Sequence, residues 1–354
     1  MLSGIIYCAQ PNKMMYTIKA KEVNIPSNGN HDFLFRMSHS KPGDTLICIT
    51  SRVNDSLVLW NLKNLTFLKT IIYSKEGPNG IAGQILKTYF HNVDSIFVLT
   101  YDYLYIISQY GTIVNKYLFD LEKYGSKGYR PHYNFLDIQN CLYSSRKKLF
   151  YFSITTLASK TEELYDTPLF VALDLLSGDI NVDYPSIPVD IRDSYYPPFA
   201  ESVIYFMQNK IIYSFVGVPD IWEYNLDSKV INHVEIQNLK KTPSNKQFGF
   251  INSEKSLEFA NAGINYFNLI PNASGEYFLR FVIDNSQKKL SGDPKISILI
   301  LNNKYELLAQ KEYPKDMLAP FILPYEEGFL IKSKRNLTEN SANYLFLSII
   351  KTTE

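Results

Sequence analysis

The sequence predicts an all-β protein, a six-bladed β-propeller with four-stranded antiparallel blades. Short runs rich in Ile, Val, Tyr and Phe follow one another closely, and tight turns containing Asp, Asn and Gly separate them. The aromatic share is 14%, with 27 Tyr and 22 Phe, which favours strands over helices. The four-run plan recurs at about 45 to 70 residues without a helical period, as in propellers.

Residues 75–119 show the plan most clearly. A turn at 75–80 precedes four apolar runs that tight turns connect, which is typical of a β-meander. The last run alternates apolar with polar residues, as expected for an outer, half-solvated strand. The runs of this blade are 85–90, 95–100, 103–108 and 113–118.

The other blades follow the same order. The first is predicted at 33–35, 45–49, 56–62 and 67–72, the third at 133–136, 148–154, 169–175 and 180–182, the fourth at 202–206, 210–216, 221–226 and 230–234, and the fifth at 264–267, 277–283, 296–301 and 306–310.

A sixth blade, at 320–323, 328–332 and 344–350, is one strand short. The unassigned run 16–23 would pair with it and close the ring, which removes free sheet edges. The alternative is a seven-bladed ring, with a further blade in 155–168 or 236–263.

The outer hairpin carries an Asn or Asp at the same place in four of the repeats. These residues are Asn61, Asp174, Asn225 and Asn302. Side chains of this kind hydrogen-bond the turn backbone and tolerate left-handed conformations. We therefore expect them to cap the outer turns.

The bulk composition fits one folded domain, residues 14–354, preceded by a leader or flexible N-terminus at 1–13. The net charge of +1 argues against a nucleic-acid partner. No run approaches the roughly 18 apolar residues of a membrane span. Leu2-Ser3-Gly4 resembles the start of a lipoprotein box, but Ile5 stands where the lipidated Cys belongs. Because the match is only partial, one expectation is that the lipid anchor belongs to a longer precursor of this chain.

The turn at 75–81, followed by the runs at 96–98, 103–107 and 110–114, resembles six-bladed propellers of the NHL and TolB-like kind. It is most similar to uncharacterised bacterial propeller proteins, often predicted lipoproteins, with a Gly-Pro-Gly loop ahead of a blade. Asn79 replaces the second glycine of that loop. The resemblance covers one blade closely and the others only by pattern. It implies an extracytoplasmic location, in the periplasm or at the cell surface, with the cytoplasm as the alternative, and carries over no catalytic residue.

Motifs for catalysis and cofactor binding are missing from the sequence. It contains no phosphate loop, dinucleotide fingerprint, His-Glu-x-x-His, Cys-x-x-Cys or Gly-x-Ser-x-Gly. The five histidines are scattered without metal-ligand spacing. We therefore expect no metal and no cofactor, and assign no catalytic residue.

Candidate binding residues lie in the loops that join successive blades, because these loops surround one mouth of a propeller channel. Arginine with tyrosine is typical of surfaces that contact proteins or carbohydrates. The structural alternative is that Arg130 pairs with Asp190 and the tyrosines pack against blade edges. The candidates are Glu76 in loop 75–84, Arg130 and His132 in loop 129–133, and Asp190, Arg192, Tyr195 and Tyr196 in loop 190–198.

The sequence thus predicts a monomeric, non-catalytic module that binds a protein or carbohydrate ligand at the channel mouth. A sensor or scaffold for a partner protein would share every one of these features. The alternative is a hydrolase or lyase, if Glu76, His132, Asp190 and Asp193 converge as acid and base in the central funnel.

Overall fold

The computed structural model is built almost entirely of β-strands, in two compact units. The N-terminal unit comprises residues 26–188 and 206–208, and the C-terminal unit comprises 1–25, 189–205 and 209–354. The residues that the structure describes are 14–26, 37–39, 46–51, 56–61, 64, 66–124, 128–132, 141–156, 161–195, 200–207, 209–246, 258, 262–287, 294–312, 317–333 and 341–353.

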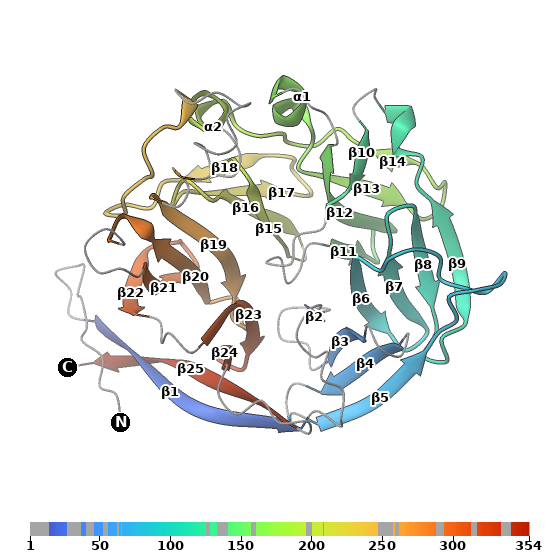
Figure 1. Ribbon diagram of the computed structural model, residues 1–354, viewed down its shortest axis with the longest axis horizontal. Helices are drawn as coiled ribbons and strands as arrows, with labels where there is room; N and C mark the ends of the chain where they lie inside the picture. Colours follow the sequence, from blue (N-terminus) through green and yellow to red (C-terminus); the bar gives the residue numbers. More distant parts are fainter. Residues whose placement is uncertain are drawn as a thin grey trace. The chain divides into compact units, whose positions relative to one another are not determined.

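The N-terminal unit contains three antiparallel sheets (Figure 1). Apolar side chains of the first two sheets form one shared core, with Leu57 and Ile71 against Ile96, Val98 and Tyr105. The first sheet has the order β2 (Met37–His39), β3 (Leu46–Ser51), β4 (Ser56–Asn61) and β5 (Thr66–Ile72), and the second has β6 (Lys87–Asn92), β7 (Ser95–Leu99), β8 (Tyr103–Ile107) and β9 (Ile113–Leu118).

The third sheet of this unit has β12 (Leu149–Thr156) at its centre. On one side β12 pairs with β13 (Phe170–Asp174), which pairs with β14 (Ile180–Asn181). On the other side β12 pairs with two short strands, β10 (Tyr129–Pro131) and β11 (Cys141–Ser144). The short helix α1 (Thr161–Asp166) connects β12 with β13, and a 3₁₀ turn, η1 (Leu121–Tyr124), precedes β10.

The C-terminal unit contains three four-stranded antiparallel sheets and the short helix α2 (Val189–Ser194). The first has β15 (Ser202–Phe206), β16 (Lys210–Phe215), β17 (Ile221–Asn225) and β18 (Ile231–Val234), and the second has β19 (Ile264–Pro271), β20 (Tyr277–Asp284), β21 (Lys295–Asn302) and β22 (Leu307–Glu312). A short 3₁₀ turn, η3 (Asn285–Gln287), follows β20.

The last sheet takes its outer strand from the other end of the chain. Its order is β23 (Met317–Tyr325), β24 (Gly328–Ser333), β25 (Ser341–Thr353) and β1 (Met14–Pro26). Figure 1 shows β1 running beside β25. The predicted pairing of run 16–23 with the last sheet is therefore confirmed. None of the helices in the described part of the chain is long and apolar enough to cross a membrane.

The predicted all-β class and the four-stranded antiparallel sheets are confirmed, with three local differences. Residues 129–131 form strand β10 instead of a loop, because Arg130 pairs with Thr155 and finds backbone partners where β12 extends beyond β11. Residues 189–194 form α2 instead of a loop. The insertion 155–168 carries α1, and the described residues of 236–263 contain no strand, so neither described part holds a further blade.

Two predicted inner strands, 33–35 and 133–136, lie outside the described residues, as does segment 1–13. The structure instead places β2 beside β3, and β10 and β11 beside β12. Turn residues such as Asn and Gly mark hairpins well, but they do not mark where an inner strand begins.

Three of the four predicted turn caps are confirmed and repeat one backbone design, whereas most of the turn after Asn61 lies outside the described residues. The carboxylate or amide oxygen of Asp174, Asn225 and Asn302 accepts hydrogen bonds from amides that follow it in the turn. Each turn also contains a residue with positive φ, namely Gly178 at 79°, Lys229 at 58° and Tyr305 at 64°. The amide donors are Leu176 (2.7 Å), Asp227 and Ser228 (both 2.9 Å), and Lys304 and Glu306 (both 2.9 Å).

The turn residue Tyr305 connects two sheets of the C-terminal unit. It follows β21, yet its hydroxyl donates a hydrogen bond to Glu223 on β17, which also pairs with Lys210 on β16. Its ring packs against Phe278 at a centroid distance of 5.0 Å. Burial and the bond to the Glu223 carboxylate raise the pKa of Tyr305, so the phenol remains a donor.

We expect Tyr305→Phe to lower the free energy of unfolding by about 1–2 kcal/mol, because a partly buried bond to a carboxylate is lost while the ring is retained. Urea denaturation followed by circular dichroism measures the change. Tyr110→Phe is the matched control, because that side chain is 75% exposed. Equal effects of the two changes would show that the phenol–carboxylate bond contributes nothing.

Candidate functional site

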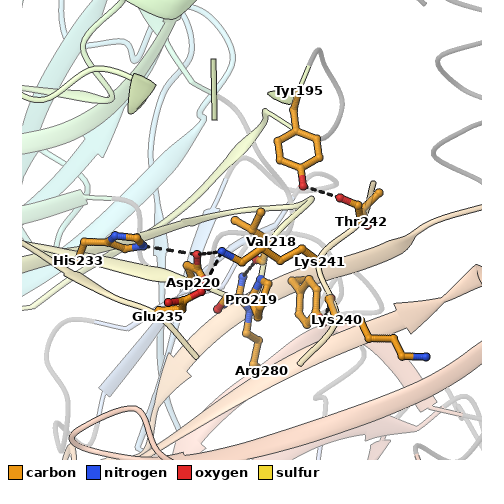
Figure 2. Close-up of polar contacts among 11 residues, drawn as sticks. Tyr195, Val218, Pro219, Asp220, His233, Glu235, Lys240, Lys241, Thr242 and Arg280 are labelled. Atoms are coloured by element: carbon orange, nitrogen blue, oxygen red, sulfur yellow. Dashed lines mark hydrogen bonds and ion pairs between the residues drawn. The ribbon is translucent and has the colours of Figure 1, made fainter. Parts of the chain in front are cut away.

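A buried arginine begins the polar cluster of the C-terminal unit (Figure 2). Arg280 interrupts the apolar strand β20 and is 1% exposed. Its Nη2 donates to the carbonyl of Val218 at 3.0 Å, and its Nη1 donates to the carbonyl of Pro219. Both carbonyls belong to the connection between β16 and β17. The Nε of Arg280 has no hydrogen-bond partner among the described residues.

Asp220, the next residue of that connection, is also 1% exposed. Its Oδ2 lies 2.7 Å from the Nζ of Lys241 and 3.5 Å from the Nε2 of His233. Lys241 additionally lies 3.4 Å from the carboxylate of Glu235. The second oxygen of Asp220, Oδ1, has no partner within the described chain. One carboxylate oxygen therefore holds two basic groups while the other holds none.

Two tyrosines hold the backbone around Lys241. The hydroxyl of Tyr195 donates to the carbonyl of Thr242 at 2.5 Å, and the hydroxyl of Tyr266 donates to the carbonyl of Lys240 at 2.6 Å. Because the carbonyls of both flanking residues are hydrogen-bonded, the backbone that carries the Lys241 side chain is fixed in position. Figure 2 shows Lys241 directed toward Asp220, whereas Lys240 extends away from it.

A stacked pair holds His233. The imidazole lies parallel to the indole of Trp222, with 4.5 Å between ring centroids and 4° between planes. The two residues are direct neighbours across β17 and β18. Trp222 is buried and His233 is 43% exposed on its side chain, so one face of the imidazole is covered.

The pKa shifts in this cluster keep Arg280 and Lys241 cationic and keep the phenols of Tyr195 and Tyr266 protonated at neutral pH. Burial lowers the pKa of Arg280 to about 10, against the opposing effects of Tyr266 and Asp220. Burial raises the pKa of Tyr266 to about 12 and also raises that of Tyr195. Burial alone would lower the pKa of Lys241, but its bonds to Asp220 and Glu235 raise it overall. The shifts thus favour ion pairing and hydrogen bonding over proton transfer.

The chemistry open to this cluster is the binding of charged groups. Lys241 and His233 are partly exposed bases directed at one point, the Oδ2 atom of Asp220. Within the part of the chain that the structure describes, His, Cys, Asp and Glu side chains form no group of three or more that could hold a metal ion.

Three of the candidates predicted from the sequence lie in or after α2. Asp190 is exposed in the first turn; burial is the main cause of the raised pKa of Tyr195, and the charge of Asp190 adds a small effect in the same direction. Arg192 is partly buried in the last turn. Tyr195 joins the polar cluster through Thr242, as an internal donor instead of an exposed contact residue. Tyr196 lies outside the described residues.

The remaining candidates belong to the N-terminal unit. Arg130 is exposed on β10, with its guanidinium carbon 6.0 Å from the ring centroid of Tyr101. His132 follows on the same segment, and its amide donates to the carbonyl of Ser153 at 2.9 Å. Glu76 is exposed in a separate turn, where its amide and carbonyl both bond the hydroxyl of Ser74.

The environment of His132 is cationic. Burial lowers the pKa of this imidazole to about 4, and the positive charges of Lys87 and Arg130 act in the same direction. Burial also raises the pKa of the Cys141 thiol to about 12, although the charge of Lys87, which acts on both groups, opposes this shift. At neutral pH the imidazole is uncharged beside two cations, and the thiol is protonated.

His132 should make the protein acid-sensitive. The pKa of His132 is lower in the folded than in the unfolded chain. Its contribution to the free energy of unfolding is therefore complete above about pH 6.5 and is lost as the pH falls toward 4. Between pH 7 and pH 4.5 we expect the wild type to lose about 2 kcal/mol more free energy of unfolding than His132→Asn. Urea denaturation of both proteins at each pH measures this, and parallel pH profiles would contradict it.

The sequence interpretation missed Asp220, His233, Lys241 and Arg280. One signal was present, because a buried arginine in an otherwise apolar strand must find polar partners. The partners themselves gave no local signal. Arg280 binds carbonyls 61 and 62 residues away, and Lys241 lies 21 residues from Asp220.

Comparison with known proteins finds solved structures of similar fold and one matching family model. The chain aligns with a crystal structure of a DUF4221 family member from Bacteroides vulgatus ATCC 8482, at 16% identity and a TM-score of 0.72, covering 97% of this chain and 100% of that one. It also aligns with the crystal structure of a candidate exported protein from Bacteroides fragilis NCTC 9343, at 11% identity and a TM-score of 0.60, covering 95% and 96%.

Among curated proteins, none matches the sequence. The two crystal structures show likeness of fold alone, because their identities to this chain are low. A family model described as a domain of unknown function, DUF4221, matches residues 14–311, most of the chain. The protein therefore belongs to the DUF4221 family.

Proposed function

We propose that this protein is a non-catalytic binding module, a single six-bladed β-propeller of residues 14–354 related to NHL and TolB-like propellers. Its ligand, a protein or a carbohydrate, would bind the inter-blade segments at the channel mouth. The six antiparallel sheets and the pairing of β1 with β25 support this architecture. Small-angle scattering that fits a disc with a central hole would support it, and an elongated two-body profile would contradict it.

The observation that carries the binding function is the arrangement of Arg130, Tyr101 and His132. The guanidinium is exposed over an aromatic ring, which provides apolar area and directional donors together. The adjacent imidazole is uncharged at neutral pH and can donate and accept hydrogen bonds. Such a surface suits recognition of a hydroxyl-rich or carboxylate-bearing ligand.

The alternative is a hydrolase or lyase with a carboxylate and a histidine in the central funnel. That chemistry needs an acid close to the imidazole and a pKa near the working pH. The charges that act on His132 are both positive, and its pKa of about 4 leaves it a weak base. These features favour binding over catalysis at His132.

A glycan array, with wild type and Arg130→Ala as paired probes, tests the proposal. We expect the wild type to bind a defined subset of glycans and Arg130→Ala to lose at least about tenfold in affinity, the loss of one well-placed contact. Arg146→Ala is the control, because Arg146 is exposed in a hairpin turn of the same unit. A protein ligand would instead appear as an Arg130-dependent partner in crosslinking.

Fluorogenic 4-methylumbelliferyl glycosides and esters test the enzyme alternative. Turnover by the wild type that His132→Asn abolishes would replace the binding proposal with catalysis. Turnover that His132→Asn leaves unchanged would point to a contaminant.

We further propose an extracytoplasmic, monomeric protein, anchored by lipid in a longer precursor. The likeness to a candidate exported protein supports the location. Fractionation of the native cells and light scattering of the purified chain, which has a monomer mass of 40.9 kDa, test these points. A cytoplasmic fraction or a doubled mass would contradict them.

A further inference from the structure

Asp220 and Arg280 are buried opposite charges, and each keeps one unused hydrogen-bonding atom. Asp220 Oδ1 and Arg280 Nε have no partner among the described residues, although both side chains are 1% exposed. Most buried polar atoms in proteins are paired, so two unpaired atoms in one cluster need an explanation. The charge of Asp220 acts on Arg280, so the two groups lie within electrostatic range.

Each unused atom is the complement of the other. Nε donates a hydrogen bond and Oδ1 accepts one. In the observed arrangement, Asp220 turns its Oδ2 to Lys241 while Arg280 binds backbone carbonyls. Rotation of the Asp220 side chain toward Arg280 would pair the two unused atoms. It would leave Lys241 and His233 without their shared counter-charge.

Lys241 and His233 are arranged to receive another anion in that case. Their nitrogens lie 2.7 and 3.5 Å from the same oxygen, so one anion can contact both. Their side chains are 45% and 43% exposed, so they can be reached from solvent. The tyrosine-bound backbone around Lys241 and the Trp222 stack fix their positions.

We propose that Lys241 and His233 form a binding site for an oxyanion, a carboxylate or phosphate group, which Asp220 occupies in the ligand-free protein and leaves by turning toward Arg280. The site lies in the C-terminal unit and is separate from the surface of Arg130 and His132. Asp220 acts as an internal competitor for the ligand. Glu235, which is 66% exposed and 3.4 Å from Lys241, is a second and weaker competitor.

The exchange keeps the buried charge of Asp220 paired in both arrangements. Before binding, Asp220 is paired with Lys241 and His233, and after binding it is paired with Arg280 while the ligand takes its place. A buried charge left without a partner would be strongly destabilising, and Arg280 prevents this. A ligand shifts such an equilibrium only by its preference for one arrangement, and an oxyanion can bind only the open one.

Isothermal titration calorimetry with inorganic phosphate and with succinate, at pH 7 and low ionic strength, tests the site. Asp220→Asn keeps the side-chain shape and removes the competing charge. We expect it to bind at least about tenfold more tightly than the wild type, and Lys241→Met to bind at least about tenfold more weakly. Lys240→Met is the matched control and should stay within about twofold, because Lys240 extends away from Asp220 (Figure 2).

The results show which of the two oxyanions the site prefers, and they include outcomes that would overturn the proposal. A preference for phosphate over succinate, or the reverse, identifies the oxyanion. Weaker binding by Asp220→Asn, no binding by any variant, or equal losses in Lys240→Met and Lys241→Met would each overturn the proposal. The last result would indicate non-specific charge attraction.

A second measurement on the unmodified protein covers the case in which the variants fail to fold. In the ¹⁵N-labelled wild type, the Arg280 Nε–H resonance should shift on phosphate addition, because Nε gains a carboxylate partner. The resonance of Arg130, which lies in the other unit, should not shift along the same binding curve. An unchanged Arg280 signal at saturating phosphate would overturn the exchange.

Discussion

Arg280→Met is expected to lower the free energy of unfolding by about 3–5 kcal/mol, the largest effect of any side chain in the polar cluster. The change removes two bonds to the Val218 and Pro219 carbonyls, which are left buried without donors. It also removes the positive charge of Arg280, which acts together with that of Lys241 on the buried Asp220. Urea denaturation followed by circular dichroism measures the loss.

The control is an exposed cation of the same unit. Lys295→Met breaks an ion pair with Glu312 at 3.1 Å, in which both side chains are about half exposed or more, and should cost less than about 1 kcal/mol. A similar small cost for Arg280→Met would mean that the carbonyls find other donors and that Arg280 is not central to the cluster.

Gly111→Ala should cost about 3 kcal/mol or more, for a steric reason. A Cβ at this position would lie 1.9 Å from the carbonyl oxygen of Ile72, and φ is +77°. The turn between β8 and β9 therefore touches the end of β5 directly. Added atoms at such a contact force the backbone apart, in addition to the cost of the left-handed conformation. Thermal and urea denaturation both measure the effect.

Gly178→Ala separates these two costs. Gly178 has almost the same φ, +79°, but no atom lies within 4 Å of the position that a Cβ would take there. Only the left-handed conformation then opposes alanine, at about 1–2 kcal/mol. If both substitutions cost the same, the close approach of Gly111 to Ile72 does not hold in solution.

Local pattern was sufficient for much of the fold. Strands β6 to β9 match the predicted runs closely because short apolar runs and compact turns lie within about forty residues of one another. Asp174, Asn225 and Asn302 were predictable as turn caps for the same reason, since each bonds amides two to four residues away.

Local pattern failed where the backbone found distant partners. Tyr129–Pro131 contains an arginine and a proline, yet it is a strand because β12 extends past β11 and offers an open edge. Val189–Ser194 reads as a loop by its charges and the prolines that follow, yet it forms one short helix.

The order of residues along the chain was enough to specify the all-β class, the sheet hairpins, the turn caps and the strand β1 that completes the last sheet. The polar cluster exists only in the folded protein, because Asp220, Lys241 and Arg280 meet through folding and not through spacing. The same is true of the cationic setting of His132, whose neighbour Lys87 lies on another sheet. The pattern of apolar and turn residues depends on neighbours in sequence, whereas the burial and the charge environment of a side chain depend on its neighbours in space.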